Sequence, residues 1–84
     1  MRIALIPAYE PEPVLLKLLA ELRNADFAVV IVDDGSGSDY SKLFHQAGQM
    51  AEILTNKQNC GKGSALKTGL QYILNQFSVH ERGL

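Results

Sequence analysis

Two adjacent carboxylates, Asp33 and Asp34, follow an apolar run directly and lead into the alternating glycines and serines of GSGSD. A carboxylate pair in this place can hold a metal ion, a sugar hydroxyl or a nucleotide. Adjacent side chains of an extended backbone point to opposite faces, so the pair is not expected to act together on one substrate atom. Two readings stay open: one carboxylate fixes the loop through backbone N–H groups while the other faces a ligand, or both are solvated acids of an Asx turn.

A second polar segment, NCGKG, combines Gly61 and Gly63 with the positive charge of Lys62. It does not match a G-x-x-x-x-G-K-[ST] phosphate loop, because Asn56 stands at the first glycine position and Gly63 stands where Ser or Thr is required. Nor does it match a dinucleotide fingerprint, because Leu66 occupies the third glycine position. The glycines still allow close approach of a ligand to the backbone, and a helix N-terminus with a lysine suits a phosphate or diphosphate. The alternative is a helix entry with a solvated lysine.

Alternating strand and helix patterns must position these residues. Apolar runs predict strands over residues 2–7, 27–32 and 51–56, and helical spacing of apolar residues predicts helices over 14–23, 40–47 and 64–77. Ser38 or Asp39 is the expected N-cap of the middle helix. The last helix carries one apolar stripe, made of Leu66, Leu70, Ile73, Leu74 and Phe77.

This order predicts an α/β fold, a Rossmann-like three-layer αβα arrangement with a mostly parallel sheet. Ligands of such sheets bind outside the carboxyl ends of the strands. The segments PAYE, DDGSGS and NKQNCGKG are therefore expected along one rim.

Length and composition narrow the class of protein. The chain has 84 residues, a net charge of −1 and one cysteine, Cys60, which gives no electrostatic case for nucleic acid and fits a reducing, cytoplasmic compartment. The sequence ends just after a helix, where an α/β chain normally enters another strand. We therefore interpret residues 1–84 as a single partial domain, the N-terminal piece of a longer protein, whose exposed sheet edge can form a homo-oligomer.

Three segments taken together, IPAYEPE, VVIVDDGSGSD and NCGKGSALKTGL, resemble in order and spacing the N-terminal half-domain of family 2 glycosyltransferases with the GT-A fold, over about residues 2–74. The pairing of VDDGS with GKGSALKTG is similar to the polyprenyl-phosphate sugar synthase branch. The resemblance implies a site for a nucleotide-diphosphate sugar, a UDP- or GDP-sugar, and transfer to a polyprenyl-phosphate, lipid or saccharide acceptor.

The resemblance also implies which residues bind the donor. Asp34 would hydrogen-bond the base, Asp33 would shape the pocket, and Lys62 would face base or phosphate. The full set comes from the end of the first strand, the DDGS turn and the glycine loop: Pro7, Ala8, Tyr9, Glu10, Asp33, Asp34, Gly35, Ser36, Gly61, Lys62 and Gly63.

The family's Asp-x-Asp metal motif follows a fourth strand and does not occur in this sequence. By resemblance, a divalent cation, Mg²⁺ or Mn²⁺, is expected in the full-length enzyme with its ligands outside this chain. No catalytic residue is assigned here, and the isolated chain is expected to be inactive. Membrane contact, at the cytoplasmic face, is expected only through missing C-terminal regions. The alternatives are a nucleotidyltransferase-like protein and a non-catalytic nucleotide-binding module.

Overall fold

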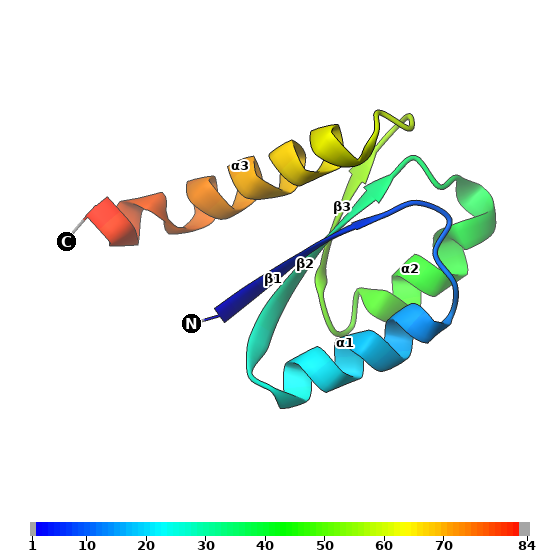
Figure 1. Cartoon of the computed structure of the whole chain (residues 1–84), viewed down its shortest axis with the longest axis horizontal. Helices are drawn as coiled ribbons and strands as arrows, with labels where there is room; N and C mark the ends of the chain where they lie inside the picture. The colour runs from blue at the N-terminus through cyan, green and yellow to red at the C-terminus, as the bar shows by residue number, and fades with distance from the viewer. Residues whose placement is uncertain (1, 83–84) are drawn as a thin grey trace.

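A computed structural model describes the backbone of residues 2–82 and the side chains of residues 2–76. Strands and helices alternate along the chain (Figure 1). Their bounds are β1 Arg2–Ala8, α1 Val14–Asn24, β2 Phe27–Asp34, a 3-10 turn η1 Ser38–Tyr40, α2 Ser41–Ala47, β3 Glu52–Asn56 and α3 Lys62–Arg82.

The sheet is parallel, with the strand order β1-β2-β3. The central strand β2 is buried from Val29 onward, as expected for an apolar strand covered on both faces. It runs two residues further than predicted, because Asp33 pairs with Ala8 of β1 and with Thr55 of β3. The carboxyl ends of all three strands therefore stop side by side.

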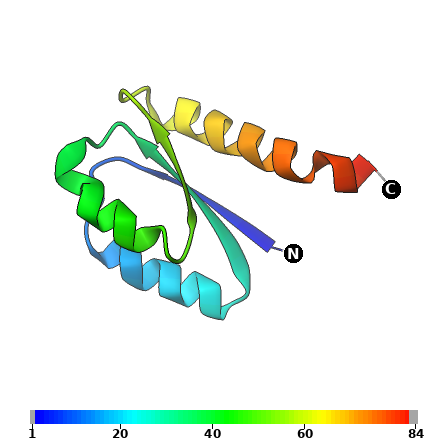
Figure 2. The ribbon, with the colours of Figure 1, turned by 180° about the vertical axis from the view of Figure 1, so that it is seen from behind.

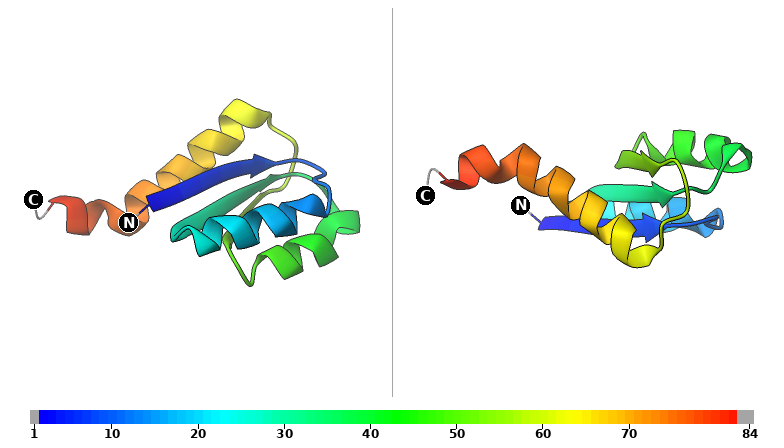
Figure 3. Two further views of the ribbon diagram at one scale, coloured as in Figure 1. Left: turned by 60° about the horizontal axis from the view of Figure 1, so that its bottom comes forward. Right: turned by 90° about the horizontal axis from the view of Figure 1, so that it is seen from above.

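Helices cover both faces of this sheet, which confirms the three-layer prediction. Helices α1 and α2 lie together on one face and α3 crosses the other (Figures 2 and 3). The main core lies under α1 and α2, where Leu19 and Ala47 are completely buried with Ile31 of β2. The N-terminus of α3 lies near the carboxyl ends of the strands, because this helix runs back along the sheet (Figure 1).

The predicted N-cap of the middle helix was wrong. Residues Ser38–Tyr40 form the 3-10 turn η1, and Tyr40 occupies the N-cap position of α2 without a side-chain hydrogen bond. The turn closes when the Tyr40 N–H donates to the Gly37 carbonyl oxygen at 3.1 Å. Ser38 and Asp39 lie inside this turn, so neither stands at the boundary where a capping side chain would act.

Helix α3 differs from its prediction in its bounds, Lys62–Arg82 against the predicted 64–77, and in the side chains that face the sheet. It begins at Lys62, two residues early, and the Ala65 N–H donates to the Gly61 carbonyl oxygen at 3.0 Å. Small residues, Ala65 and Gly69, face the sheet and allow a close approach. The larger residues of the predicted stripe, Leu66, Leu70 and Leu74, are instead exposed by 37%, 52% and 55%; the side chain of Phe77 lies outside the described residues.

Candidate functional site

The three predicted loop segments meet around one cavity of about 390 Å³ at the carboxyl ends of the strands. The end of β1, the end of β2 and the loop leading into α3 each contribute to its wall. The lining residues are Pro7, Ala8, Tyr9, Asp34, Asn59, Gly61, Lys62 and Ala65. The prediction that these segments share one rim is confirmed.

Asp34 is buried in the wall of this cavity and accepts three hydrogen bonds. Its Oδ1 accepts from Asn56 Nδ2 at 2.9 Å and from the Cys60 N–H at 3.1 Å, and its Oδ2 accepts from the Gly61 N–H at 2.8 Å. The bond from Asn56 is the main reason why the pKa of Asp34 lies below its ordinary value, and the N–H groups of Cys60 and Gly61 lower the pKa further. The carboxylate therefore fixes the loop before α3.

Asp33 points to the other face of the sheet, as predicted for adjacent residues of a strand. Its Oδ1 accepts a hydrogen bond from the Ser36 N–H, three residues further along the chain, at 3.0 Å, which holds the turn that follows β2. Together with Gly35, it lines a separate cavity of about 360 Å³ beside α2. The two carboxylates therefore do not converge on one point.

Ser36 connects the turn after β2 to the loop after β1. Its Oγ accepts a hydrogen bond from the Glu10 N–H at 2.8 Å. Glu10 has a φ of 47°, a left-handed backbone conformation that is uncommon outside glycine. The residues 33–36, the DDGS turn, thus hold both other loops of the rim in place.

Three exposed side chains of the cavity wall remain available to a ligand: those of Tyr9, Asn59 and Lys62. Tyr9 is 52% exposed, and the negative charge of Glu10, followed by a hydrogen bond to Glu10, raises the pKa of its phenol. Lys62 is exposed at the first residue of α3. Between them, Gly61 has a φ of 94° and open space where a Cβ would stand. The cavity thus combines an aromatic ring, a lysine and a helix N-terminus.

A comparison with protein families decides the membership of the chain. A model described as Glycosyl transferase family 2 matches residues 3–79. The chain belongs to glycosyltransferase family 2. The resemblance to family 2 glycosyltransferases is therefore confirmed.

One similar protein is considerably longer than this chain. The chain is 35% identical, over 77 residues, to an uncharacterized protein of Methanocaldococcus jannaschii, covering 87% of this chain and 34% of that protein. The chain thus spans about a third of the length of this relative. No solved structure matched the chain. Within residues 2–82, no helix is long and apolar enough to cross a membrane.

Not all the site residues predicted for this family 2 chain share the cavity. Six of them line it: Pro7, Ala8, Tyr9, Asp34, Gly61 and Lys62. Glu10 and Ser36 bond to each other instead, Asp33 and Gly35 line the neighbouring cavity, and Gly63 stands in the first turn of α3.

Sequence reasoning missed Asn56, Asn59 and Ala65. Asn59 lies directly before the glycine pattern CGKG, so its proximity to that pattern was an available signal. Asn56 donates a hydrogen bond to Asp34, which is 22 residues away in the sequence, and no local pattern marks that contact. Ala65 follows the loop as an ordinary helical residue.

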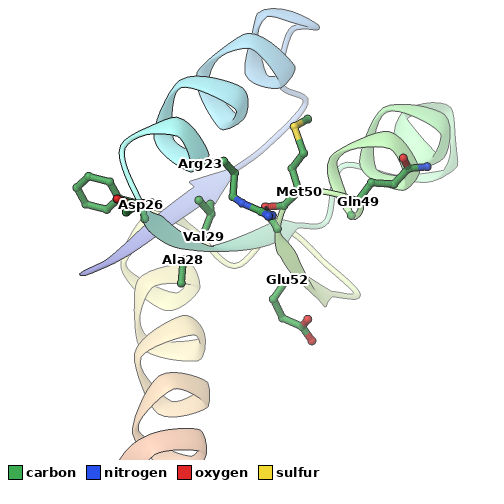
Figure 4. Close-up of a pocket in the computed structure, with 10 residues that line it drawn as sticks. Arg23, Asp26, Ala28, Val29, Gln49, Met50 and Glu52 are labelled. Atoms are coloured by element: carbon green, nitrogen blue, oxygen red, sulfur yellow. Dashed lines mark hydrogen bonds between the residues drawn. The ribbon is translucent and has the colours of Figure 1, made fainter. Parts of the chain in front are cut away.

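A larger open cavity, of about 590 Å³, lies at the opposite end of the sheet (Figure 4). It is formed where α1 ends and β3 begins, and Arg23 Nη1 donates there to the Met50 carbonyl oxygen at 3.0 Å. Asp26 and Glu52 also line it. Because ligands of parallel α/β sheets bind at the carboxyl ends of the strands, the smaller cavity is the better candidate site of the family 2 chain.

Proposed function

We propose that this chain binds the nucleotide and diphosphate of a nucleotide-sugar donor, as the N-terminal half of a glycosyltransferase donor site. The observation that carries the proposal is the cavity of about 390 Å³ at which the three rim loops are tied together. Ligand pockets commonly measure about 300–1,000 Å³. The complete protein would transfer sugar from UDP or GDP to a polyprenyl-phosphate, lipid or saccharide acceptor.

Each part of such a donor has a matching group in the cavity. The exposed ring of Tyr9 offers a stacking surface for a base. Asn56, Cys60 and Gly61 use three of the about four acceptor positions of the Asp34 carboxylate, which leaves about one for a base N–H. Lys62 and the N-terminus of α3 would attract the diphosphate.

The two aspartates do not fit the divalent cation that the family implies. The oxygens of Asp34 face N–H donors and Asp33 Oδ1 accepts the Ser36 N–H, so the pair does not present a set of converging ligands. The residues described by the structure contain no group of three His, Cys, Asp or Glu placed to hold a metal ion. We therefore assign this chain only binding and orientation of the donor, and expect no sugar transfer by the isolated 84 residues.

The test is a titration of the ¹⁵N-labelled chain with UDP, GDP and free diphosphate, followed by NMR. We expect UDP or GDP to shift the amide signals of Ala8, Tyr9 and Gly61. Lys62→Ala should weaken nucleotide binding about tenfold, because a hydrogen bond to a charged group contributes about 1.5 kcal/mol or more. Lys67→Ala is the matched control, since Lys67 is also exposed on α3 but lies outside the cavity wall, and it should leave binding unchanged.

Three outcomes would contradict the proposal. The first is that nucleotides at millimolar concentration leave every rim amide unshifted, and the second is that they shift only residues around the cavity of Figure 4. Equal weakening by Lys62→Ala and Lys67→Ala would show that the lysines act only through overall charge.

A further inference from the structure

Asn56 is the last residue of β3 and lies outside the wall of the candidate donor cavity. Its side chain nevertheless contacts a residue of that wall, since Nδ2 donates a hydrogen bond to Asp34 Oδ1 at 2.9 Å. The two residues are Cα partners in the register of β2 and β3. Strand pairing therefore holds the amide group of Asn56 opposite the carboxylate.

The Asp34 carboxylate in turn fixes the position of the loop that carries the ligand-facing groups. Asp34 accepts the N–H groups of Cys60 and Gly61 at 3.1 and 2.8 Å, and Lys62 follows directly in the chain. Residues 57–61 contain no helix or strand, so the structure ties this loop to the sheet through side-chain contacts. Without its bond to Asn56, the Asp34 side chain would lose the one donor that comes from the sheet.

We propose that Asn56 is a positioning residue of the donor site: it fixes the Asp34 carboxylate, which in turn places Gly61 and Lys62 for the ligand. Its effect on nucleotide affinity rests on the function proposed above. Its effect on the order of the loop does not, and can be measured without any ligand.

The arrangement predicts a pH dependence with a definite sign. The pKa of Asp34 lies below its ordinary value of 3.8, chiefly because of the Asn56 bond. The ionised carboxylate holds the loop at neutral pH, and the hold is lost as the pH falls through this lowered pKa. Asn56→Ala should raise the pKa of Asp34, so that the loop is released at a higher pH.

Other charged and titratable groups near Asp34 remain in place in this variant. Tyr9 faces it from the end of β1, where the charge of Asp34 contributes to the raised pKa of the phenol. The remaining groups are Asp33 of β2, Cys60 of the loop before α3 and Lys62 at the start of α3. A shift in the titration of Asp34 in the Asn56→Ala variant is thus attributable to the lost amide.

The first experiment follows the amide signals of Cys60 and Gly61 by NMR as the pH of the unliganded chain is lowered. In the wild type both signals should move together with one midpoint, that of Asp34. The midpoint should rise in Asn56→Ala and rise further in Asn56→Asp, which places a second carboxylate against Asp34. Asn75→Ala is the matched control, because Asn75 is exposed on α3, and its midpoint should equal that of the wild type.

The second experiment measures the affinity for UDP or GDP at pH 7. Asn56→Ala should weaken it about tenfold, and Asn75→Ala should not change it. An unshifted midpoint or an unchanged affinity in Asn56→Ala would overturn the inference. Should Asn56→Ala not fold, the comparison is made between the wild type and Asn56→Asp. The inference is then refuted if the amide signals of Cys60 and Gly61 do not move as Asp34 titrates.

The two proposals fail in different ways. Absence of nucleotide binding by the wild type refutes the donor site, and the amide midpoints then decide alone whether Asn56 orders the loop. Normal binding by the wild type together with unshifted midpoints in Asn56→Ala refutes only the role of Asn56.

Discussion

Gly35 allows the DDGS turn to touch the loop before α3, backbone against backbone. A Cβ at this position would stand 2.4 Å from the Asn59 nitrogen and 2.5 Å from the Gln58 carbonyl carbon. The φ of 79° adds a conformational cost for any other residue. Gly35→Ala should therefore destabilise the chain by about 2–4 kcal/mol, from left-handed strain and overpacking together. Urea unfolding measures this loss.

Gly37 is the natural control for this substitution. Its φ is 93°, but nothing lies within 4 Å of the place where its Cβ would stand. Gly37→Ala should lower the free energy of unfolding by about 1–2 kcal/mol, the cost of the left-handed backbone conformation alone. Equal losses for the two variants would mean that the two loops do not meet at Gly35.

The sequence predicted part of this residue-scale arrangement. The alternation of side chains along a strand was enough to place Asp33 and Asp34 on opposite faces. It was not enough to choose their partners, because the donors to Asp34 come from residues 22 to 27 positions further along the chain. Such contacts exist only once β2 and β3 are paired.

Helix α3 lies close to the sheet because Gly69 has no side chain. A Cβ there would stand 2.2 Å from Leu5 Cδ1 and 3.0 Å from Val32 Cγ2. Leu5 can rotate away, but Val32 is completely buried in the central strand. Gly69→Ala should thus lower stability by about 1 kcal/mol, since overpacking outweighs the gain of about 0.5–1 kcal/mol that alanine brings to a helix.

Gly63 provides the comparison within the same helix. It lies in the first turn with open space around its Cβ position, so Gly63→Ala should raise stability by about 0.5 kcal/mol. Thermal or urea unfolding shows whether each of the two substitutions raises or lowers stability. A stabilising Gly69→Ala would show that α3 lies further from the sheet than described here.

At the scale of elements, the apolar runs predicted every strand and helix within a few residues. The stripe of leucines on α3 did not identify the face of the helix that contacts the sheet. A helix can pack on a sheet through small residues and leave its larger residues exposed. The early start of α3 was missed because Lys62 and Gly63 are poor signals for a helix, while the bond from the Ala65 N–H to Gly61 depends on the loop geometry.

The whole molecule exposes one side of β1. Within residues 2–82, this strand pairs with β2 alone. The exposed leucines of α3 lie on the same side. Tyr72 lines a cavity together with Glu52 of β3 and so points towards β3. Leu70 and Leu74, two residues away at about 100° per residue, point away from β3. An open strand edge therefore lies beside an apolar helix face.

We propose that a second copy of the 84-residue chain occupies this surface, with the two β1 strands antiparallel across a two-fold axis. Unpaired edges tend to join other strands, and a two-fold arrangement satisfies both edges with one interface. Sedimentation at about millimolar concentration should show dimers. Leu70→Glu should shift them to monomers, because it places a charge in the apolar face, whereas Gln71→Glu, at an exposed neighbouring position, should not.

The competing occupant is a strand from the remainder of a longer protein, since this chain spans 34% of its relative's length. Experiment can separate the two occupants. A segment of the same polypeptide that pairs with β1 would cover the leucines of α3 within one molecule, without forming a dimer. Dimers of the 84-residue chain that persist in Leu70→Glu, or a wild type that stays monomeric throughout, would refute pairing through β1. Self-association that weakens with Leu70→Glu and not with Gln71→Glu would instead place the interface along this edge, next to the helix that begins the donor site.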